Sequence, residues 1–344
     1  MQLLRTLRAG GIAVFAAACM LGGSAAFVHS VHSVHSAQEI SAGSADTSAQ
    51  ADVPSYQATG GNGEGSEGDA QEVKLRHAAW TVETRPGSTP VAEYPVLPGT
   101  SAMQRVGDRE YLLSVPAEYT GETPTPVLIV FHGWKETAQS MLQGNNLMSN
   151  EAIVIFAQGV QNAWAGAPYS ATTFEQDAQY VQQVLTQVGK HYNLDPQRFY
   201  AAGFSNGGAF AYSLACHAGA PIKAVVSVAG SMYPAMHQDC EGVAVPTLLM
   251  QGTSDPVISV DGGQRHGQTY ASAWTVAQEA AQRAQCEQKV VESTAGTISA
   301  PALARQFEGC AAPVRYVEVQ GMRHSWSQEQ GTSGYMWDFF KQNT

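Results

Sequence analysis

The segment that decides the fold is FYAAGFSNGG, residues Phe199–Gly208. An apolar, strand-like run leads into the pattern GxSxG centred on Ser205, and the helix-compatible sequence AFAYSLAC follows. A strand, a tight turn with a serine at its centre and a helix in succession are typical of a nucleophile elbow. GxSxG alone is a weak pattern, and a Gly/Ser-rich turn without chemistry is the alternative. The strand and the helix on either side of the turn favour a nucleophilic Ser205.

A serine hydroxyl at neutral pH needs a base and a group that orients that base. Asp255 comes just after the apolar run TLLMQG, and His324 comes just after VRYVEV. Both therefore lie past the carboxyl ends of predicted strands, where open α/β sheets place their sites. The order serine, aspartate, histidine is that of the α/β-hydrolases, not that of chymotrypsin-like or subtilisin-like proteases. We predict Ser205 as nucleophile, His324 as base and Asp255 as the orienting acid.

Other acidic residues and histidines could fill the same roles. Asp239 adjoins Cys240 in a predicted loop, and Asp261 lies in Gly-rich sequence away from a strand end. Among the histidines, only His324 follows a terminal strand after the acid. The others are predicted to be surface or core residues: His132, His191, His217, His237 and His266.

A second turn is predicted to complete an oxyanion hole. His132-Gly133-Trp134 directly follows the apolar run VLIVF, at the turn that supplies one oxyanion donor in this fold. The backbone N–H groups of Trp134 and Asn206 would then bind the oxyanion of a tetrahedral intermediate. An ordinary turn is the alternative reading of the HG pair. Three further side chains are candidates for substrate binding: His132, Trp164 and Trp326. For the two tryptophans, a role in packing is equally compatible with the sequence.

The chain from about Thr100 onward alternates strand-like and helical patterns. This alternation predicts an α/β fold with a mostly parallel sheet and helices on both faces. QRVGDREYLLSV predicts a hairpin turning at Gly107-Asp108, and apolar residues from Phe174 to Val188 recur at helical spacing. Further helices are expected after Ser205, stopping at Gly219, and near Gly331 to Lys341. The predicted buried strands are Val127–Phe131, Ile153–Ala157, Arg198–Phe204, Ala224–Gly230, Thr247–Gly252 and Val314–Val319.

Composition narrows the class of partner and cofactor. Charged residues make up only 14% of the 344 residues, and the net charge is -11. Without clustered Lys and Arg, nucleic acid is not an expected partner. No CxxC or Cys/His ligand spacing predicts a metal site, and the proposed chemistry requires no cofactor. Four cysteines beyond the first segment predict two disulfides; of three possible pairings, proximity favours Cys216 with Cys240 and Cys286 with Cys310.

The N-terminal region predicts export. Arg5 and Arg8 precede an apolar run and then small residues, the order of a secretory signal. Residues 1–36, which end in the repeat VHSVHSVHS, are a predicted signal peptide or membrane anchor; cleavage, retention and lipidation at Cys19 stay open. Residues 37–76 are a predicted disordered linker, and residues 77–344 are the predicted catalytic domain. A secreted or cell-surface protein is expected, with membrane contact only through an uncleaved first segment.

These residues resemble the secreted esterases related to polyhydroxybutyrate depolymerases and to feruloyl or acetylxylan esterases. The resemblance spans roughly Arg105 to Phe340 and is carried by VLIVFHGW, YNLDPQRFYAAGFSNGG, AVVSVAG, QGTSDPVI and VEVQGMRHSW. It implies a triad of Ser205, Asp255 and His324, with Trp134 and Asn206 as oxyanion donors. One departure is the bulky Trp134, where relatives often have a cysteine or a small residue.

The activity that the resemblance implies is hydrolysis of carboxylic esters with short, aromatic or hydroxyalkanoate acyl groups. The substrate would be a small molecule or an ester linked to a polysaccharide. Two alternatives remain at this stage: a cell-envelope acyltransferase with the same triad, and an inactive hydrolase fold kept as a binding module. The sequence makes no prediction of oligomeric state.

Overall fold

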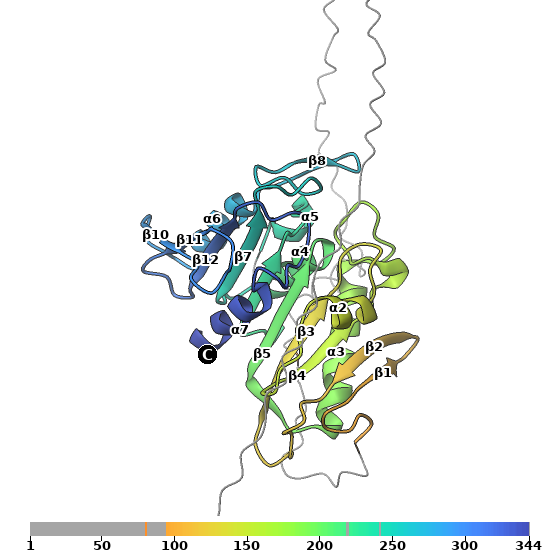
Figure 1. The fold of residues 1–344 in the computed structure, drawn as a ribbon. Helices are drawn as coiled ribbons and strands as arrows, with labels where there is room; N and C mark the ends of the chain where they lie inside the picture. Colours follow the sequence, from red (N-terminus) through yellow and green to blue (C-terminus); the bar gives the residue numbers. More distant parts are fainter. Residues whose placement is uncertain (1–79, 81–93, 218–219, 241, 344) are drawn as a thin grey trace, which may run out of the picture. The chain divides into compact units, whose positions relative to one another are not determined.

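The computed structural model describes Trp80 and residues 94–217, 220–240 and 242–343 (Figure 1). Within these residues, a ten-stranded sheet forms the centre of the domain. Its strands are β1 (Ser101–Val106), β2 (Arg109–Ser114), β3 (Thr125–Phe131), β4 (Ile153–Ala157), β5 (Leu194–Phe204), β6 (Ala224–Val228), β7 (Thr247–Gly252), β10 (Val290–Thr294), β11 (Ala302–Phe307) and β12 (Val314–Val319).

The strand order is β1-β2-β4-β3-β5-β6-β7-β12-β11-β10. The central strands from β4 to β12 pair in parallel, whereas the pairs at both edges are antiparallel. The predicted mostly parallel sheet is therefore confirmed. Parallel pairing brings the carboxyl ends of β3, β5, β7 and β12 to one edge of the sheet.

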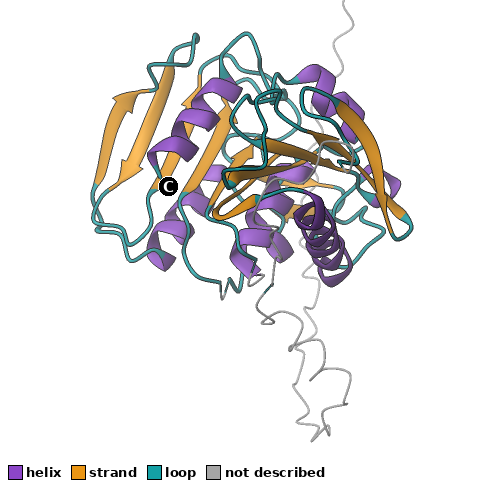
Figure 2. Ribbon diagram, turned by 90° about the horizontal axis from the view of Figure 1, so that it is seen from below, coloured by secondary structure: helices purple, strands orange, loops and turns teal. Residues whose placement is uncertain are grey.

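Helices cover both faces of this sheet, as Figure 2 shows. They are α2 (Ala138–Gly144), α3 (Phe174–His191), α4 (Asn206–His217), α5 (Pro234–His237), α6 (Ala273–Arg283) and α7 (Thr332–Gln342), with a short 3-10 turn η2 (Val160–Asn162). Successive side chains of a strand point to opposite faces. Accordingly, Ile129 and Phe131 of β3 pack with α3 and α4, while Leu128 and Val130 pack with α2 and α7. The predicted helices on both faces are confirmed.

The predicted elements agree with the observed ones. All six buried strands are present, with earlier starts for β3 and β5 and an earlier end for β6, at Val228. The hairpin is β1–β2, and its Gly107 has a φ of 58°. Helix α3 begins at Phe174 because Thr173 caps it, accepting a hydrogen bond from the Gln176 N–H. Helix α4 ends at His217, and the predicted stop at Gly219 lies outside the described residues.

Several elements were not predicted. The edge strand β10 and its neighbour β11 are one case, and β10 is largely exposed, so no apolar run marks it. A separate hairpin, β8 (Gly263–Arg265) with β9 (Gln268–Tyr270), is mostly polar and equally unmarked. The helices α2, α5 and α6 were also missed. Strand β10 and the hairpin β8–β9 carry too few buried side chains for hydrophobic periodicity to reveal them. Helix α6 buries mainly alanines, which mark an apolar face only weakly.

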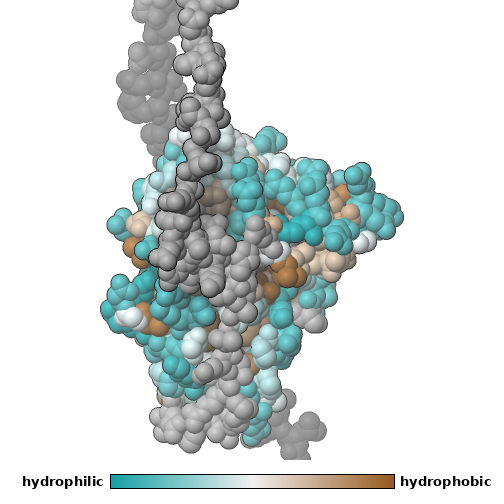
Figure 3. Space-filling model, turned by 180° about the vertical axis from the view of Figure 1, so that it is seen from behind, coloured by the Kyte–Doolittle hydropathy of each residue, from teal (hydrophilic) through white to brown (hydrophobic). Residues whose placement is uncertain are grey.

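The predicted export segment with its histidine repeat, and the predicted linker, lie outside the described residues. In the described ranges, no helix combines the length and the apolar character that a bilayer crossing requires. The described surface in Figure 3 is mainly hydrophilic, with small hydrophobic patches. Uncharged polar residues, rather than many ion pairs, therefore supply much of the solvated surface, in line with the low charged fraction of 14%.

Candidate active site

Ser205 occupies a strained turn between β5 and α4. Its φ is 54°, in the left-handed region that side chains other than glycine rarely adopt. The turn is held because the Ser205 N–H donates to Val228 O at 2.9 Å and the Ser205 carbonyl accepts from the Ser231 N–H at 3.3 Å. A Cβ at Gly203 would collide with the carbonyl of Gly207, and a Cβ at Gly207 would collide with that of Phe131. The two glycines of GxSxG are therefore needed for close backbone approach.

The structure brings the three predicted triad side chains together at the carboxyl edge of the sheet. His324 Nε2 lies 2.9 Å from Ser205 Oγ, and His324 Nδ1 lies 2.7 Å from Asp255 Oδ2. Asp255 follows β7 and His324 follows β12, although the two residues are 69 positions apart in the sequence. A chain of hydrogen bonds thus runs from a carboxylate through an imidazole to a hydroxyl.

The environment of Asp255 keeps its side chain ionised. Burial opposes ionisation, but hydrogen bonds from His324 and from the N–H groups of Ile258 and Val257 outweigh it and hold the pKa of Asp255 below its usual range. The two backbone donors contact Oδ1 at 2.9 and 2.8 Å. Gln251 Nε2 donates to Oδ2 at 3.1 Å. Because an ionised carboxylate only accepts, His324 carries its proton on Nδ1, and Nε2 is free to accept the Ser205 proton.

The two backbone amides predicted to form an oxyanion hole, those of Trp134 and Asn206, lack protein acceptors among the described residues. In the turn after β3, the Gly133 N–H donates to Glu136 Oε2 at 2.9 Å, and the Lys135 N–H donates to Asn162 O at 2.8 Å. The Trp134 N–H between them has no protein acceptor among the described residues, nor has the N–H of Asn206, the first residue of α4. Unsatisfied N–H groups at a helix start and a fixed turn suit a developing negative charge.

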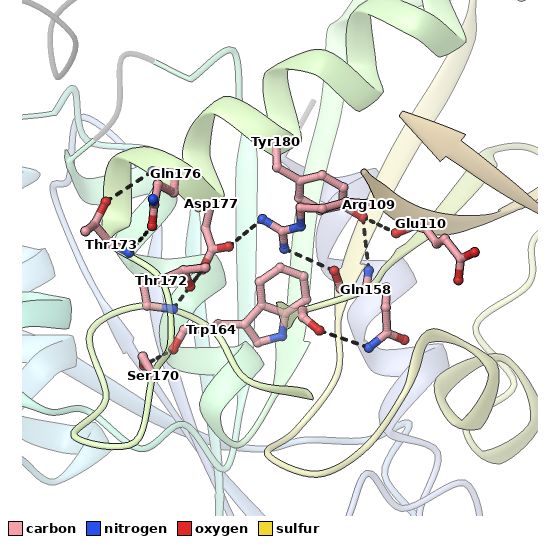
Figure 4. A network of polar contacts seen from close by, with 12 residues as sticks. Arg109, Glu110, Gln158, Trp164, Ser170, Thr172, Thr173, Gln176, Asp177 and Tyr180 are labelled. Carbon is pink, nitrogen blue, oxygen red and sulfur yellow. Dashed lines mark hydrogen bonds and ion pairs between the residues drawn. The ribbon is translucent and has the colours of Figure 1, made fainter. Parts of the chain in front are cut away.

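A buried polar network fixes the loop that packs against this elbow (Figure 4). The Asn206 side chain accepts from the Trp164 N–H at 2.7 Å and donates to the Trp164 carbonyl at 3.2 Å. Asp177 of α3, which is fully buried, accepts from the neighbouring Ala165 N–H at 2.9 Å and from Arg109 Nη1 at 2.7 Å. The network therefore links the start of α4 to β2 and α3. None of its side chains except Trp164 and Asn206 was singled out from sequence.

The three side chains predicted to bind substrate are buried. His132 and Trp164 are 0% exposed, and Trp326 is 5% exposed. His132 Nε2 accepts from the Gly159 N–H at 3.0 Å, Trp164 Nε1 donates to His132 O at 3.0 Å, and Trp326 Nε1 donates to Ser333 Oγ at 2.8 Å. Burial, opposed by a hydrogen bond to Gly133 O, lowers the pKa of His132 to about 4. These contacts give the three side chains packing and positioning roles and leave the substrate-binding prediction without support.

The rival bases His237 and His266 form no hydrogen bond with a triad side chain in the described structure. His237 Nδ1 pairs with Glu279 Oε2 at 2.7 Å, and His266 lies at the turn between β8 and β9. The cysteines are joined as Cys216–Cys240 and Cys286–Cys310, which is the pairing favoured by proximity. His217 lies close to the first pair, but both sulfurs of that pair are engaged in the disulfide.

Fold and site together define the class: this is an α/β-hydrolase, with a serine on the elbow after β5 and histidine and aspartate from the ends of later strands. The family model described as "Putative esterase" matches residues 103–327, and the chain belongs to that family. The matched segment contains Ser205, Asp255 and His324. The protein is a carboxylic-ester hydrolase related to feruloyl esterases.

Two curated relatives illustrate this likeness. The probable feruloyl esterase C of Aspergillus flavus is 27% identical over 232 residues, covering 64% of this chain and 78% of the relative. Feruloyl esterase C of Emericella nidulans is 24% identical over 255 residues, covering 70% and 87%. Among solved structures, the acetyl xylan esterase from Aspergillus awamori superposes with a TM-score of 0.50 at 11% identity, covering 69% of this chain and 100% of that one. This last likeness supports the fold alone.

Proposed function

We propose that this protein cleaves carboxylic esters with Ser205 as nucleophile, His324 as general base and acid, and Asp255 as the group that orients the imidazole. The observation that carries the proposal is the continuous hydrogen-bond chain, 2.7 Å from Asp255 to His324 and 2.9 Å from His324 to Ser205. These distances are within the reach that proton transfer requires.

In the first half-reaction, Ser205 Oγ attacks the ester carbonyl while its proton moves to His324 Nε2. The negative charge that develops on the carbonyl oxygen is stabilised by the N–H groups of Trp134 and Asn206. The C–O bond of the ester then breaks, and His324 returns the proton to the leaving alcohol. Asp255 stays ionised and stabilises the imidazolium between these two transfers.

In the second half-reaction, water replaces the alcohol. His324 takes a proton from water as it attacks the acyl-enzyme, a second tetrahedral species forms, and the acid leaves as Ser205 regains its proton. Every proton is accounted for between Ser205, His324, water and the products. The positions of these groups supply the catalysis without any further reactant.

The proposed substrates are esters of short, aromatic or hydroxyalkanoate acids, either free or linked to a polysaccharide. The named activity of the relatives favours a feruloyl-type aromatic acyl group. We also propose that the protein is exported, because two disulfides are maintained in oxidising compartments.

The triad is tested by hydrolysis of p-nitrophenyl acetate. Ser205→Ala and His324→Ala are expected to lower kcat by on the order of 10⁵-fold or more, and Ser205→Ala is expected to prevent labelling by a fluorophosphonate. Asp261→Asn, which changes the rival acid, is the matched control and should retain activity. If Ser205→Ala hydrolyses the ester at the wild-type rate, another nucleophile is responsible.

Substrate class is tested by comparing kcat/KM for methyl ferulate, acetylated xylan and hydroxybutyrate oligomers. The feruloyl assignment predicts the highest value for methyl ferulate. Release of free acid, rather than transfer to added sugar, distinguishes hydrolysis from acyl transfer. A product dominated by new sugar esters would contradict the hydrolase proposal.

A further inference from the structure

The hairpin β8–β9 packs against Trp134, the proposed oxyanion donor. Figure 1 shows β8 beyond one end of β7, the strand that leads to Asp255. At the tip of the hairpin, the His266 ring lies edge-on to Trp134 and to Tyr169, each with a centroid distance of 4.9 Å. At the base, Tyr270 lies edge-on to Tyr233 at 6.2 Å. The hairpin is thus fixed at both ends against residues that adjoin the oxyanion turn and β6.

The hairpin carries an arginine that lacks a partner. Arg265 is half-buried, yet among the described arginines it and Arg323 alone have no side-chain hydrogen bond to a protein acceptor. Arg323 directly precedes His324, and a third cation, Lys135, directly follows Trp134. Lys135 Nζ lies 4.1 Å from the centre of the Trp134 ring and, within the described chain, pairs with no carboxylate.

The charges of Arg265 and Lys135 change the pKa values of neighbouring side chains. Burial lowers the pKa of His266, and the charges of Arg265 and Lys135 lower it further. Arg265 also opposes the rise that burial causes in the pKa of Tyr233. The neighbouring carboxylate, Glu136, accepts a hydrogen bond from the Gly133 N–H and forms no ion pair with Lys135 in the described structure. Arg265 and Lys135 therefore place two positive charges beside His266 at the tip of the hairpin.

Two buried hydroxyls lie in the segment after β6. Ser231 is 2% exposed and Tyr233 is 0% exposed; the Tyr233 hydroxyl has no hydrogen-bond partner within the described residues, and the Ser231 hydroxyl faces Tyr169. The Ser231 N–H donates to the carbonyl of Ser205, so this segment touches the nucleophile turn itself. A buried hydroxyl without a partner costs free energy unless a ligand or water satisfies it. Hydroxyl donors beside guanidinium groups form a suitable environment for a carboxylate.

We propose that Arg265 and Lys135, which lie on either side of His266 and Trp134, recognise a free carboxylate on the ester substrate, so that the enzyme prefers anionic esters over neutral esters of the same shape. Arg265 supplies the principal contact because it is half-buried and lies next to His266, which contacts Trp134. The inference rests on the proposed function, since it concerns substrates of the Ser205 site. The carboxylate could be carried by the acyl group or by the alcohol.

Two pairs of esters test the proposal and separate these two positions. The first pair is the mono-p-nitrophenyl ester of glutaric acid and p-nitrophenyl pentanoate, in which a methyl group replaces the carboxylate of the acyl chain. The second pair is 4-acetoxybenzoate and its methyl ester, which differ in charge on the alcohol side. For at least one pair, the wild type is expected to show a kcat/KM about tenfold higher for the anionic ester. Added salt should reduce this ratio by screening the cations.

Charge changes at Arg265 should alter the ratio of the two kcat/KM values. Arg265→Gln is expected to bring the ratio near one, and Arg265→Glu to bring it below one, while Arg265→Lys keeps part of the preference. The matched control is Arg105→Gln, at an exposed arginine of β1 that pairs with Glu110; it should keep the wild-type ratio. Because a folding defect lowers both rates alike, the ratio reports recognition and not stability.

The outcomes separate the two proposals. A wild type that hydrolyses none of the four esters, nor p-nitrophenyl acetate, contradicts the proposed function. A wild type that hydrolyses neutral esters but shows a ratio of one or less in both pairs overturns the inference and leaves the proposed function standing. An undiminished preference in Arg265→Glu would likewise overturn it.

Discussion

Replacing Asp177 by asparagine tests whether the buried network of Figure 4 holds the site in place. The Asp177 carboxylate accepts three hydrogen bonds: from Arg109 Nη1 at 2.7 Å, from the Ala165 N–H at 2.9 Å and from Thr172 Oγ1 at 2.8 Å. Asparagine has almost the same shape, but one of its two groups is an NH₂ that would face donors. The guanidinium of Arg109, whose side chain is only 13% exposed, would also lose its counter-ion.

The expected loss of stability follows from this geometry. Removing one partner of a buried ion pair leaves an uncompensated charge and costs about 3–5 kcal/mol. For a domain of this size, each kcal/mol lowers the melting temperature by about 2–4 °C. We therefore expect Asp177→Asn to melt about 6–20 °C below the wild type. Because Ala165 adjoins Trp164, which binds the Asn206 side chain, kcat should also fall, by up to about 10²-fold for a displacement near 1 Å.

The assay is thermal unfolding followed by circular dichroism, together with kcat and KM for p-nitrophenyl acetate at a temperature where the variant is folded. Glu110→Gln is the matched control: it removes an exposed ion pair with Arg105 and should cost at most about 1 kcal/mol. A positioning role predicts a loss in kcat with little change in KM. A melting temperature for Asp177→Asn within 2 °C of the wild type would refute the reasoning, since a buried charge cannot lose its partner at so small a cost.

Further predictions concern three positions in or beside the site. Burial lowers the pKa of His132 from its ordinary value of 6.5 to about 4, so the unfolded chain binds the proton first as the pH falls. Acidification from pH 6.5 to 4 should therefore lower the free energy of unfolding of the wild type by roughly 3 kcal/mol more than that of His132→Gln. Urea titrations at the two pH values measure this difference. Asp255→Asn should lower kcat by about 10⁴-fold. Since the pKa of Asp255 is lowered in the fold, its stabilising contribution is present above about pH 4 and should disappear, in denaturant titrations, as the pH falls below that value. Gly207→Ala, whose Cβ would meet the Phe131 carbonyl, should cost about 1–3 kcal/mol in urea unfolding, whereas Gly144→Ala, with open space around it, should cost nothing.

The sequence reveals the site where its signals are local. Ser205, Asp255 and His324 each follow an apolar run, so their places at strand ends could be inferred from neighbouring residues alone. The same holds for the buried strands and for α3, whose apolar residues recur at helical spacing. In a parallel sheet, strand ends gather at one edge, and residues 69 positions apart therefore become neighbours. Local sequence patterns and this rule of sheet topology are therefore sufficient to predict the triad and the buried strands.

The supporting residues have no such local signal. Arg109 and Asp177 are 68 positions apart, and each looks like an ordinary surface charge in its own element. Only the packing of α3 on the sheet buries the pair, and no pattern in either segment reports it. The sequence is equally unable to show whether Trp164 and Trp326 are core residues or pocket residues. Their burial depends on loops whose paths the sequence does not specify.

The oxyanion turn depends both on residues that a sequence motif reveals and on supporting residues that no local motif reveals. The amides on either side of Trp134 are already engaged, Gly133 by a side chain of the same turn and Lys135 by the carbonyl of Asn162. The Trp134 amide is held between two fixed points and cannot rotate toward another acceptor without breaking one of these bonds. Donors that are fixed before the substrate binds need not reorient when negative charge develops on the carbonyl oxygen. A motif can therefore mark where such a donor lies, but its orientation depends on contacts from distant segments, and changes to those segments should reduce kcat before they affect substrate binding.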